Sequence, residues 1–157
     1  MTTHRLHDSR NGAAYHLGGP DQWAGFALDH PRLGPMQGKA FLRPHLNLTG
    51  MEVSLNSLAA GQGIPYLHAH RQNEECYLFL GGQGEFQLDG LQFGVCAGSA
   101  VRVDPAGMRG IRNIGSEPLL YLVIQAKAGS LEQANTADGI LGEHPPVWSA
   151  PEGAIGR

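Results

Sequence analysis

Residues 68–84 read HAHRQNEECYLFLGGQG, and this stretch carries the clearest chemical pattern of the chain. His68 and His70 lie two residues apart, so on an extended segment their side chains point to the same side. A carboxylate from the strand that follows would complete a set of three metal-binding side chains. Glu74 and Glu75 point to opposite faces of that strand, and the spacing favours Glu75 as the ligand and places Glu74 at the surface. Two imidazoles and one carboxylate suit Fe(II), Mn(II), Ni(II) or Zn(II), with open positions for a substrate.

Short apolar runs separated by turn residues extend on both sides of this stretch. Residues 76–80 are continuously apolar, as in a buried strand, and residues 51–56 alternate between apolar and polar, as in a half-buried strand. Asp89-Gly90, between two such runs, predicts a tight hairpin. The 23 glycines and 10 prolines divide the chain at short intervals, and together these patterns predict an all-β fold. Other expected strands are 39–46 (interrupted at Pro44), 64–70, 100–103, 111–113 and 119–125.

The composition narrows the classes of function. With 157 residues, 41% of them hydrophobic, the chain has the length for one domain with one core. The formal net charge is -3 and there is no basic run, so we expect no nucleic-acid partner. We also expect no signal peptide and no membrane span, because no apolar run is long enough, and we take the cytoplasm as the default location. Cys76 and Cys96 do not suggest a disulfide framework.

Two groups of residues resemble the two motifs of the cupin superfamily. The first group is a glycine, the two histidines, the glutamate and a later glycine: Gly61 or Gly63, His68, His70, Glu75 and Gly82. The leading glycine is displaced by one position either way. The second group is Gly98, Pro105, Gly107 and Asn113, in the order of the second motif. The resemblance covers residues 40–126 and implies a double-stranded β-helix, or jelly-roll barrel, that binds a divalent metal.

The resemblance also defines the expected organisation of the chain. It implies an N-terminal extension over residues 1–38, which exchanges a strand with a partner or packs on the barrel, then a barrel over 39–128 and a C-terminal segment over 129–157. In that last segment, the capping-box spacing of residues 130–133 predicts a short helix before a proline-rich tail. Cupins commonly form dimers, so we expect a homodimer with Trp148 or the N-terminal segment at its interface; Trp148 packs either there or on the body of the protein.

The chain departs from the second motif at its histidine, which usually supplies a fourth metal ligand. Arg109 is the nearest residue to that position, and a guanidinium cannot donate a lone pair to a metal. Three alternatives follow. A three-ligand site remains, or Arg109 takes over the electrostatic role of the metal by pairing with Glu75 and holding an anionic substrate, or Arg109 is an exposed arginine at the rim.

The expected pocket and its function follow from this site. Besides Arg109, we expect Tyr77 and Gln87 to contact a substrate; further wall candidates are Tyr66, Gln72, Phe79, Arg102 and Arg112. The leading hypothesis is a metal-dependent cupin that acts on an anionic or polyhydroxylated small molecule, similar to a sugar-phosphate isomerase or a dioxygenase, with its catalytic residues undefined. The second hypothesis is a non-catalytic ligand-binding cupin that has lost its metal. A purely structural dimer is a third.

Overall fold

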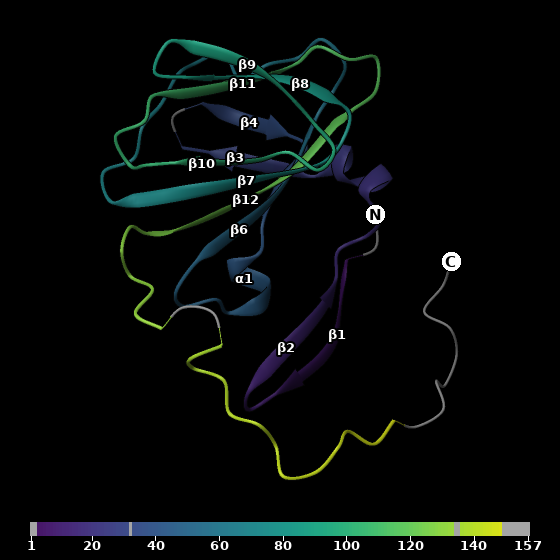
Figure 1. Ribbon diagram of the computed structural model, residues 1–157. Helices are drawn as coiled ribbons and strands as arrows, with labels where there is room; N and C mark the ends of the chain where they lie inside the picture. Colours follow the sequence, from purple (N-terminus) through teal and green to yellow (C-terminus); the bar gives the residue numbers. More distant parts are fainter. Residues whose placement is uncertain (1–2, 32, 134–135, 149–157) are drawn as a thin grey trace.

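The computed structural model describes residues 3–31, 33–133 and 136–148, and it forms a barrel of two facing sheets (Figure 1). The larger sheet has the strand order β10-β7-β12-β6-β5, and the smaller has the order β11-β8-β9. All pairings in both sheets are antiparallel. Their strands are β5 (Lys39–Phe41), β6 (Glu52–Leu58), β7 (Asn73–Gly81), β8 (Gln83–Leu88), β9 (Leu91–Cys96), β10 (Ala100–Val103), β11 (Arg109–Asn113) and β12 (Leu119–Lys127). The predicted all-β jelly-roll fold is confirmed.

The remaining elements lie before β6 in the sequence, and one of them, α1, stands between β5 and β6. Two hairpins, β1–β2 and β3–β4, and two short helices make up this part. Among the described residues, no helix is long and apolar enough to span a membrane. The bounds are β1 (His4–Ser9), β2 (Gly12–His16), the 3-10 helix η1 (Pro20–Gly25), β3 (Ala27–His30), β4 (Gly34–Gln37) and α1 (Arg43–Leu46).

The main core lies between the two sheets, because alternate residues of each strand point inward. On β7 the inward residues are Glu75, Tyr77 and Phe79, and on β8 the inward residue is Phe86, which is fully buried. Tyr77 packs edge-on against Phe86 at a centroid distance of 5.0 Å. The same alternation therefore buries the apolar core and brings the carboxylate of Glu75 into the interior.

Strand β6 is covered on both of its faces, although its alternating pattern predicts a half-buried strand. Its apolar face does not point into the barrel: Leu55 packs outside it against Trp23 of η1 and Leu42. Its polar face, with Ser54 and Asn56, is buried on the inside. The reason is that parts of the chain before β6, including η1 and the α1 region, pack over the outer face of β6, so polar side chains are left to line the interior.

Two turns have the backbone conformations that their residues predict. Asp89 and Gly90 have φ values of 50° and 85°, as a two-residue type I′ hairpin requires, and they join β8 to β9. Gly82 has a φ of 79°, and a Cβ at this position would lie 2.4 Å from the carbonyl oxygen of Pro118. A side chain at residue 82 is therefore excluded both by the backbone conformation and by a close approach of the chain.

We expect Gly82→Ala to lower the free energy of unfolding by about 2–4 kcal/mol, because left-handed strain and overpacking act together. Gly90→Ala is the matched control: φ is also positive, but no atom lies within 4 Å of the added Cβ. Its cost should be about 1–2 kcal/mol from strain alone. Urea unfolding of both variants measures the difference, and equal losses would contradict the steric argument at Gly82.

Two expected elements differ from the structure. The strand-like stretch 39–46 is a strand only to Phe41 and then becomes the helix α1, because Pro44 fits the first turn of a helix, where no N–H bond is lost. The helix expected from Ser130 does not form over 130–133 or over 136–148 of the described residues. A capping pattern marks where a helix can start, but the described part of this segment packs no apolar face against the body, and Leu131 is 77% exposed.

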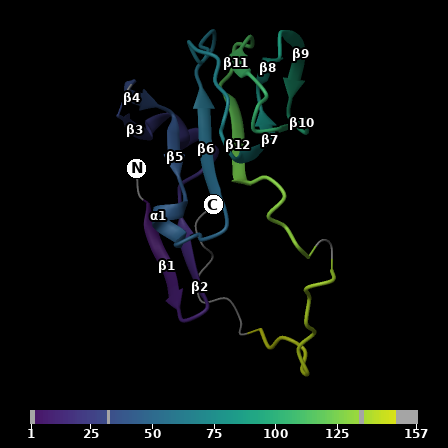
Figure 2. The same ribbon diagram turned by 90° about the vertical axis from the view of Figure 1, so that its left-hand side faces the viewer.

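The N-terminal hairpin β1–β2 and the C-terminal segment leave the barrel on the same side, as Figures 1 and 2 show. Trp148, at the end of the described chain, is 85% exposed. It therefore does not pack on the body of its own chain, which was one of the two expected positions. Residues 149–157 of the proline-rich tail, which include Pro151, lie outside the described residues.

Candidate metal and ligand site

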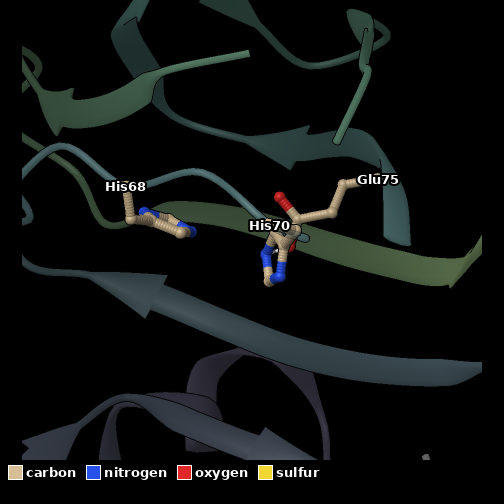
Figure 3. Close-up of side chains that lie close together, drawn as sticks. All are labelled: His68, His70 and Glu75. Atoms are coloured by element: carbon tan, nitrogen blue, oxygen red, sulfur yellow. Dashed lines mark hydrogen bonds and ion pairs between the residues drawn. The ribbon is translucent and has the colours of Figure 1, made fainter. Parts of the chain in front are cut away.

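The structure brings the three predicted metal ligands together. His68 and His70 lie on the extended segment between β6 and β7, and Glu75 lies on β7, so that their donor atoms are all within 4.8 Å of one another (Figure 3). Backbone hydrogen bonds hold the segment: His68 pairs with Arg109 in both directions, and the N–H of His70 donates to the carbonyl of Pro105 at 2.8 Å. The second motif thus positions the histidines of the first.

The two carboxylate oxygens of Glu75 have different partners. Oε2 accepts hydrogen bonds from the Tyr77 hydroxyl at 2.7 Å and from Nε and Nη2 of Arg109 at 2.9 and 2.6 Å. Oε1 faces Nε2 of His70 at 3.0 Å, the contact drawn in Figure 3. Burial alone would raise the pKa of this carboxyl, but the hydrogen bonds from Tyr77 and Arg109, together with the Arg109 charge, outweigh it and lower the pKa. Glu75 is therefore ionised, with Oε1 directed at the histidines.

Arg109 points inward and is 1% exposed, so the alternative of a rim arginine is wrong. Besides its two bonds to Glu75, its Nη1 donates to the carbonyl oxygens of Gly107 at 2.9 Å and His68 at 3.4 Å. The pairing of Arg109 with Glu75, one of the sequence-based alternatives, is confirmed. Because a guanidinium has five N–H groups and four are engaged by the protein, little of it remains for a ligand.

His68 holds the unsatisfied group of this cluster. Its Nδ1 is buried and has no hydrogen-bond partner among the described residues. Burial, followed by the positive charge of Arg109, lowers the pKa of His68 to about 4, so the imidazole is neutral at pH 7. Buried polar atoms are normally paired, and a neutral imidazole is the form that ligates a metal. The donor set of His68, His70 and Glu75 Oε1 therefore fits a divalent metal, whereas the adjacent guanidinium opposes it by its charge.

A cavity of about 510 Å³ opens beside the cluster, within the size range of small-molecule sites. The inner face of the larger sheet forms one wall, and Ile111 of β11 lies on the opposite wall. The hairpin β3–β4, which stands beside β5 in Figure 2, contributes the apolar side chains of Leu28 and Met36. The cavity thus combines an apolar edge with a polar interior that ends at the histidines.

The other predicted contact residues separate into two groups. Tyr77 lines the cavity, and burial raises the pKa of its hydroxyl, which stays protonated and donates to Glu75. Gln87 does not reach this cavity and lines a smaller depression of about 160 Å³ outside the barrel. On β8, Phe86 points inward, so its neighbour Gln87 points outward. Of the further wall candidates, Tyr66 lines the cavity, Phe79 is core, Arg102 and Arg112 form surface ion pairs, and Gln72 is outside the lining.

Two lining residues that the sequence did not indicate are Lys39 of β5 and Asn56 of β6. The Lys39 ammonium donates to Oδ1 of Asn56 at 3.1 Å. Gly38, which precedes Lys39, donates its N–H to Phe26 and accepts one from Ser57, so this start of β5 is held against the barrel. An alternating pattern shows which residues of a strand share a face. It does not show whether the polar face points to solvent or into a cavity.

The fold and the site define a small jelly-roll barrel with a candidate metal cluster over an interior cavity. A family model described as a cupin domain matches residues 55–125. A cupin protein from Bacteroides fragilis of known structure is 44% identical, with 66% of this chain and 88% of that chain covered and a TM-score of 0.63. The chain belongs to the cupin superfamily.

Two other relatives match over shorter parts. A protein from Acidithiobacillus ferrooxidans that is proposed to be a sugar phosphate isomerase is 27% identical, with a TM-score of 0.52 and coverage of 57% of this chain and 58% of that chain. An uncharacterized protein of Methanocaldococcus jannaschii is 39% identical over 56 residues, which are 36% of this chain and 45% of the archaeal protein. The matches therefore span less than two thirds of either relative.

Proposed function

We propose that this protein is a metal-dependent cupin whose cavity binds a small anionic or polyhydroxylated molecule. The observation that carries the proposal is the convergence of His68, His70 and Glu75 within 4.8 Å beside the 510 Å³ cavity. Two features support it: Glu75 Oε1 faces the histidines, and His68 leaves a buried nitrogen unpaired. Sugar-phosphate isomerisation and oxidation by dioxygen are the two reaction types that we consider; the first is also the proposed activity of the Acidithiobacillus relative.

The side chains around the cluster have defined roles in this proposal. A bound Fe, Mn, Ni or Zn ion would polarise a carbonyl oxygen or activate dioxygen. Arg109 and Tyr77 hold Oε2 of Glu75, which keeps the carboxylate ionised and leaves Oε1 as the ligand atom. Glu75 cannot also serve as the general base while it ligates, so an isomerase would need a base from another residue or from the substrate. Arg109 then acts through Glu75 and not through a bidentate contact with substrate.

A metal-free ligand-binding cupin is the second candidate, and the ion pair between Arg109 and Glu75 favours it. The guanidinium neutralises the carboxylate at 2.6 Å, which removes much of the attraction for a cation. In this case the cavity would sense or store a small molecule without chemistry at a metal.

Metal content separates the two candidates. We expect about one equivalent of Fe, Mn, Ni or Zn in protein purified without an affinity tag or chelator, and none in the double variant His68→Ala/His70→Ala. The control His7→Ala/His144→Ala removes two exposed histidines outside the cavity and should keep the metal. Elemental analysis by mass spectrometry gives the readout. If the wild-type protein holds no metal even after reconstitution, the metal-dependent function is refuted and the metal-free ligand-binding cupin is the remaining candidate.

A homodimer and a cytoplasmic location stay predictions. The projecting hairpin β1–β2 and the exposed side chains of Ile140, Leu141 and Trp148 support an interface on that side of the barrel, because extended apolar segments seldom remain fully exposed. The division into an N-terminal extension, a barrel and a C-terminal segment also stays a prediction, and so does the absence of a nucleic-acid partner.

A further inference from the structure

Lys39 lies at one end of a row of side chains across the inner face of the larger sheet. Lys39 of β5 is directly opposite Asn56 of β6, and Asn56 is directly opposite Tyr121 of β12. Residues opposite one another in adjacent strands point to the same face, and all three line the cavity. The ammonium therefore faces the same interior space as the His68, His70 and Glu75 cluster.

The charge of Lys39 has no close counterion. Its Nζ donates to Asn56 at 3.1 Å and lies 5.2 Å from the centroid of the Phe41 ring, and no carboxylate of the described residues is within ion-pairing distance. Burial lowers the pKa of the ammonium, against the opposing influence of the more distant Glu75 and Glu52. The half-buried ammonium uses one of its three N–H groups, for the bond to Asn56. Because buried charges are normally paired, it lacks an anionic partner.

The residue that holds Lys39 is itself fixed in place. Asn56 is 4% exposed, and its Nδ2 approaches the Ser54 carbonyl at 3.1 Å, the Ser54 hydroxyl at 3.0 Å and the Tyr121 carbonyl at 3.4 Å. With the amide nitrogen directed at these acceptors, Oδ1 is turned toward Lys39. A buried polar network therefore fixes the position of the Lys39 ammonium, whereas a lysine at the surface would be free to move.

The charges of the cavity wall do not cancel. Among the described lining residues the acidic side chain is Glu75, and Arg109 already neutralises it. Lys39 adds a second cationic side chain to this wall. The lysine, arginine and glutamate side chains of the lining therefore sum to one excess positive charge, and Lys39 carries it on β5, at the edge of the larger sheet, whereas Glu75 lies on β7.

We propose that Lys39, held by Asn56, is the specificity-determining residue for a small organic oxyanion, whose carboxylate or phosphate group binds the ammonium while the rest of the molecule extends toward His68 and His70. This inference rests on the proposed function in that it assigns the substrate class of the same cavity. It requires the cavity to bind a ligand but does not require the metal, so the two can fail separately.

Isothermal titration of succinate and of inorganic phosphate tests this assignment, with uncharged succinamide as the probe that lacks the negative charge. Each probe is titrated into metal-free and metal-reconstituted protein. We expect at least one of the two anions to bind the wild type, and Lys39→Met to weaken that binding about 10- to 100-fold, as the loss of a charge-assisted bond implies. Lys39→Arg keeps the charge and should retain most of the affinity.

The matched control is Lys127→Met, which removes the exposed lysine at the end of β12 and should leave anion affinity unchanged. Thermal unfolding of all three variants checks that they fold. Equal affinity of Lys39→Met and wild type, equal binding of succinamide, or no binding of either anion by the wild type would overturn the assignment. Loss of anion binding in Lys39→Met together with absence of metal would support Lys39 and refute the metal-dependent function.

Discussion

Replacement of Arg109 with methionine is expected to lower the free energy of unfolding by about 3–5 kcal/mol, the largest stability change of any single substitution considered for this site. The guanidinium is 1% exposed and contacts Glu75 through two N–H groups. Without it, the carboxylate stays buried with only Tyr77 and His70 as partners. Breaking a buried ion pair from one side leaves an uncompensated charge, and that desolvation penalty is the source of the effect.

A double-mutant cycle with Glu75→Gln isolates the interaction. The double variant Glu75→Gln/Arg109→Met has no unpaired buried charge, so it should be more stable than Arg109→Met alone. Arg112→Met is the matched control on the same strand, because Arg112 pairs with Glu85 at the surface, and we expect little measurable change there. Urea unfolding of the wild type, the two single variants, the double variant and Arg112→Met provides the free energies of unfolding. Similar losses for Arg109→Met and Arg112→Met would contradict a buried pair.

Local spacing in the sequence is sufficient to predict the three candidate ligands. The separation of His68 and His70 places both imidazoles on one side of an extended segment, and alternation on β7 turns Glu75 inward with Tyr77. Both inferences use local alternation: it places the two imidazoles on one side and Glu75 on the same face as Tyr77, whereas the fold decides that this face is inside. The hairpin at Asp89-Gly90 was predictable for the same reason, since its positive φ values are a local requirement.

The parts that were not predictable depend on which face of a strand is inside. On β6, the alternation is visible in the sequence, but the buried position of Asn56 follows from the folding of Trp23 and Leu42 over the opposite face. The inward position of Lys39 is hidden in the sequence for the same reason, because Lys39 lies opposite Asn56 on the neighbouring strand. The sequence predicts the strand that contains Gln87 but not the orientation of that strand, and the inward position of Phe86 shows that Gln87 points away from the cavity.

The position of Arg109 is predictable from the sequence, whereas the direction of its side chain depends on the fold. The motif resemblance placed it at the position of the missing histidine, but only the folded chain shows that its guanidinium is turned inward and committed to Glu75. The bridge between His68 and residue 109 accounts for this, because it fixes the start of β11 beside the first-motif histidines. The backbone of residue 109 therefore lies next to the cluster, whichever side chain it carries. A histidine at this position would place its imidazole near the other candidate ligands.

Arg109→His is expected to raise the affinity for Zn(II) or Mn(II) by at least about 100-fold. The change removes a positive charge next to the cluster and adds an imidazole to the two histidines and the carboxylate, and two such effects of 10-fold each correspond to about 2.8 kcal/mol. Competition against a metal-sensitive fluorophore measures the dissociation constants. Without metal, this variant should be less stable than the wild type, because Glu75 loses its counterion, and metal should raise its unfolding temperature strongly.

Arg109→Gln separates the two causes, since it removes the charge of the guanidinium without adding a metal ligand. If electrostatic repulsion alone limits metal binding, the glutamine and histidine variants will gain affinity equally. If position 109 lies within reach of the metal, the histidine variant will bind substantially more tightly than the glutamine variant. No gain in either variant would mean that Arg109 does not oppose a cation at this cluster. The charge argument for a metal-free cupin would then fail, because the guanidinium would serve to orient Glu75 and not to replace the metal.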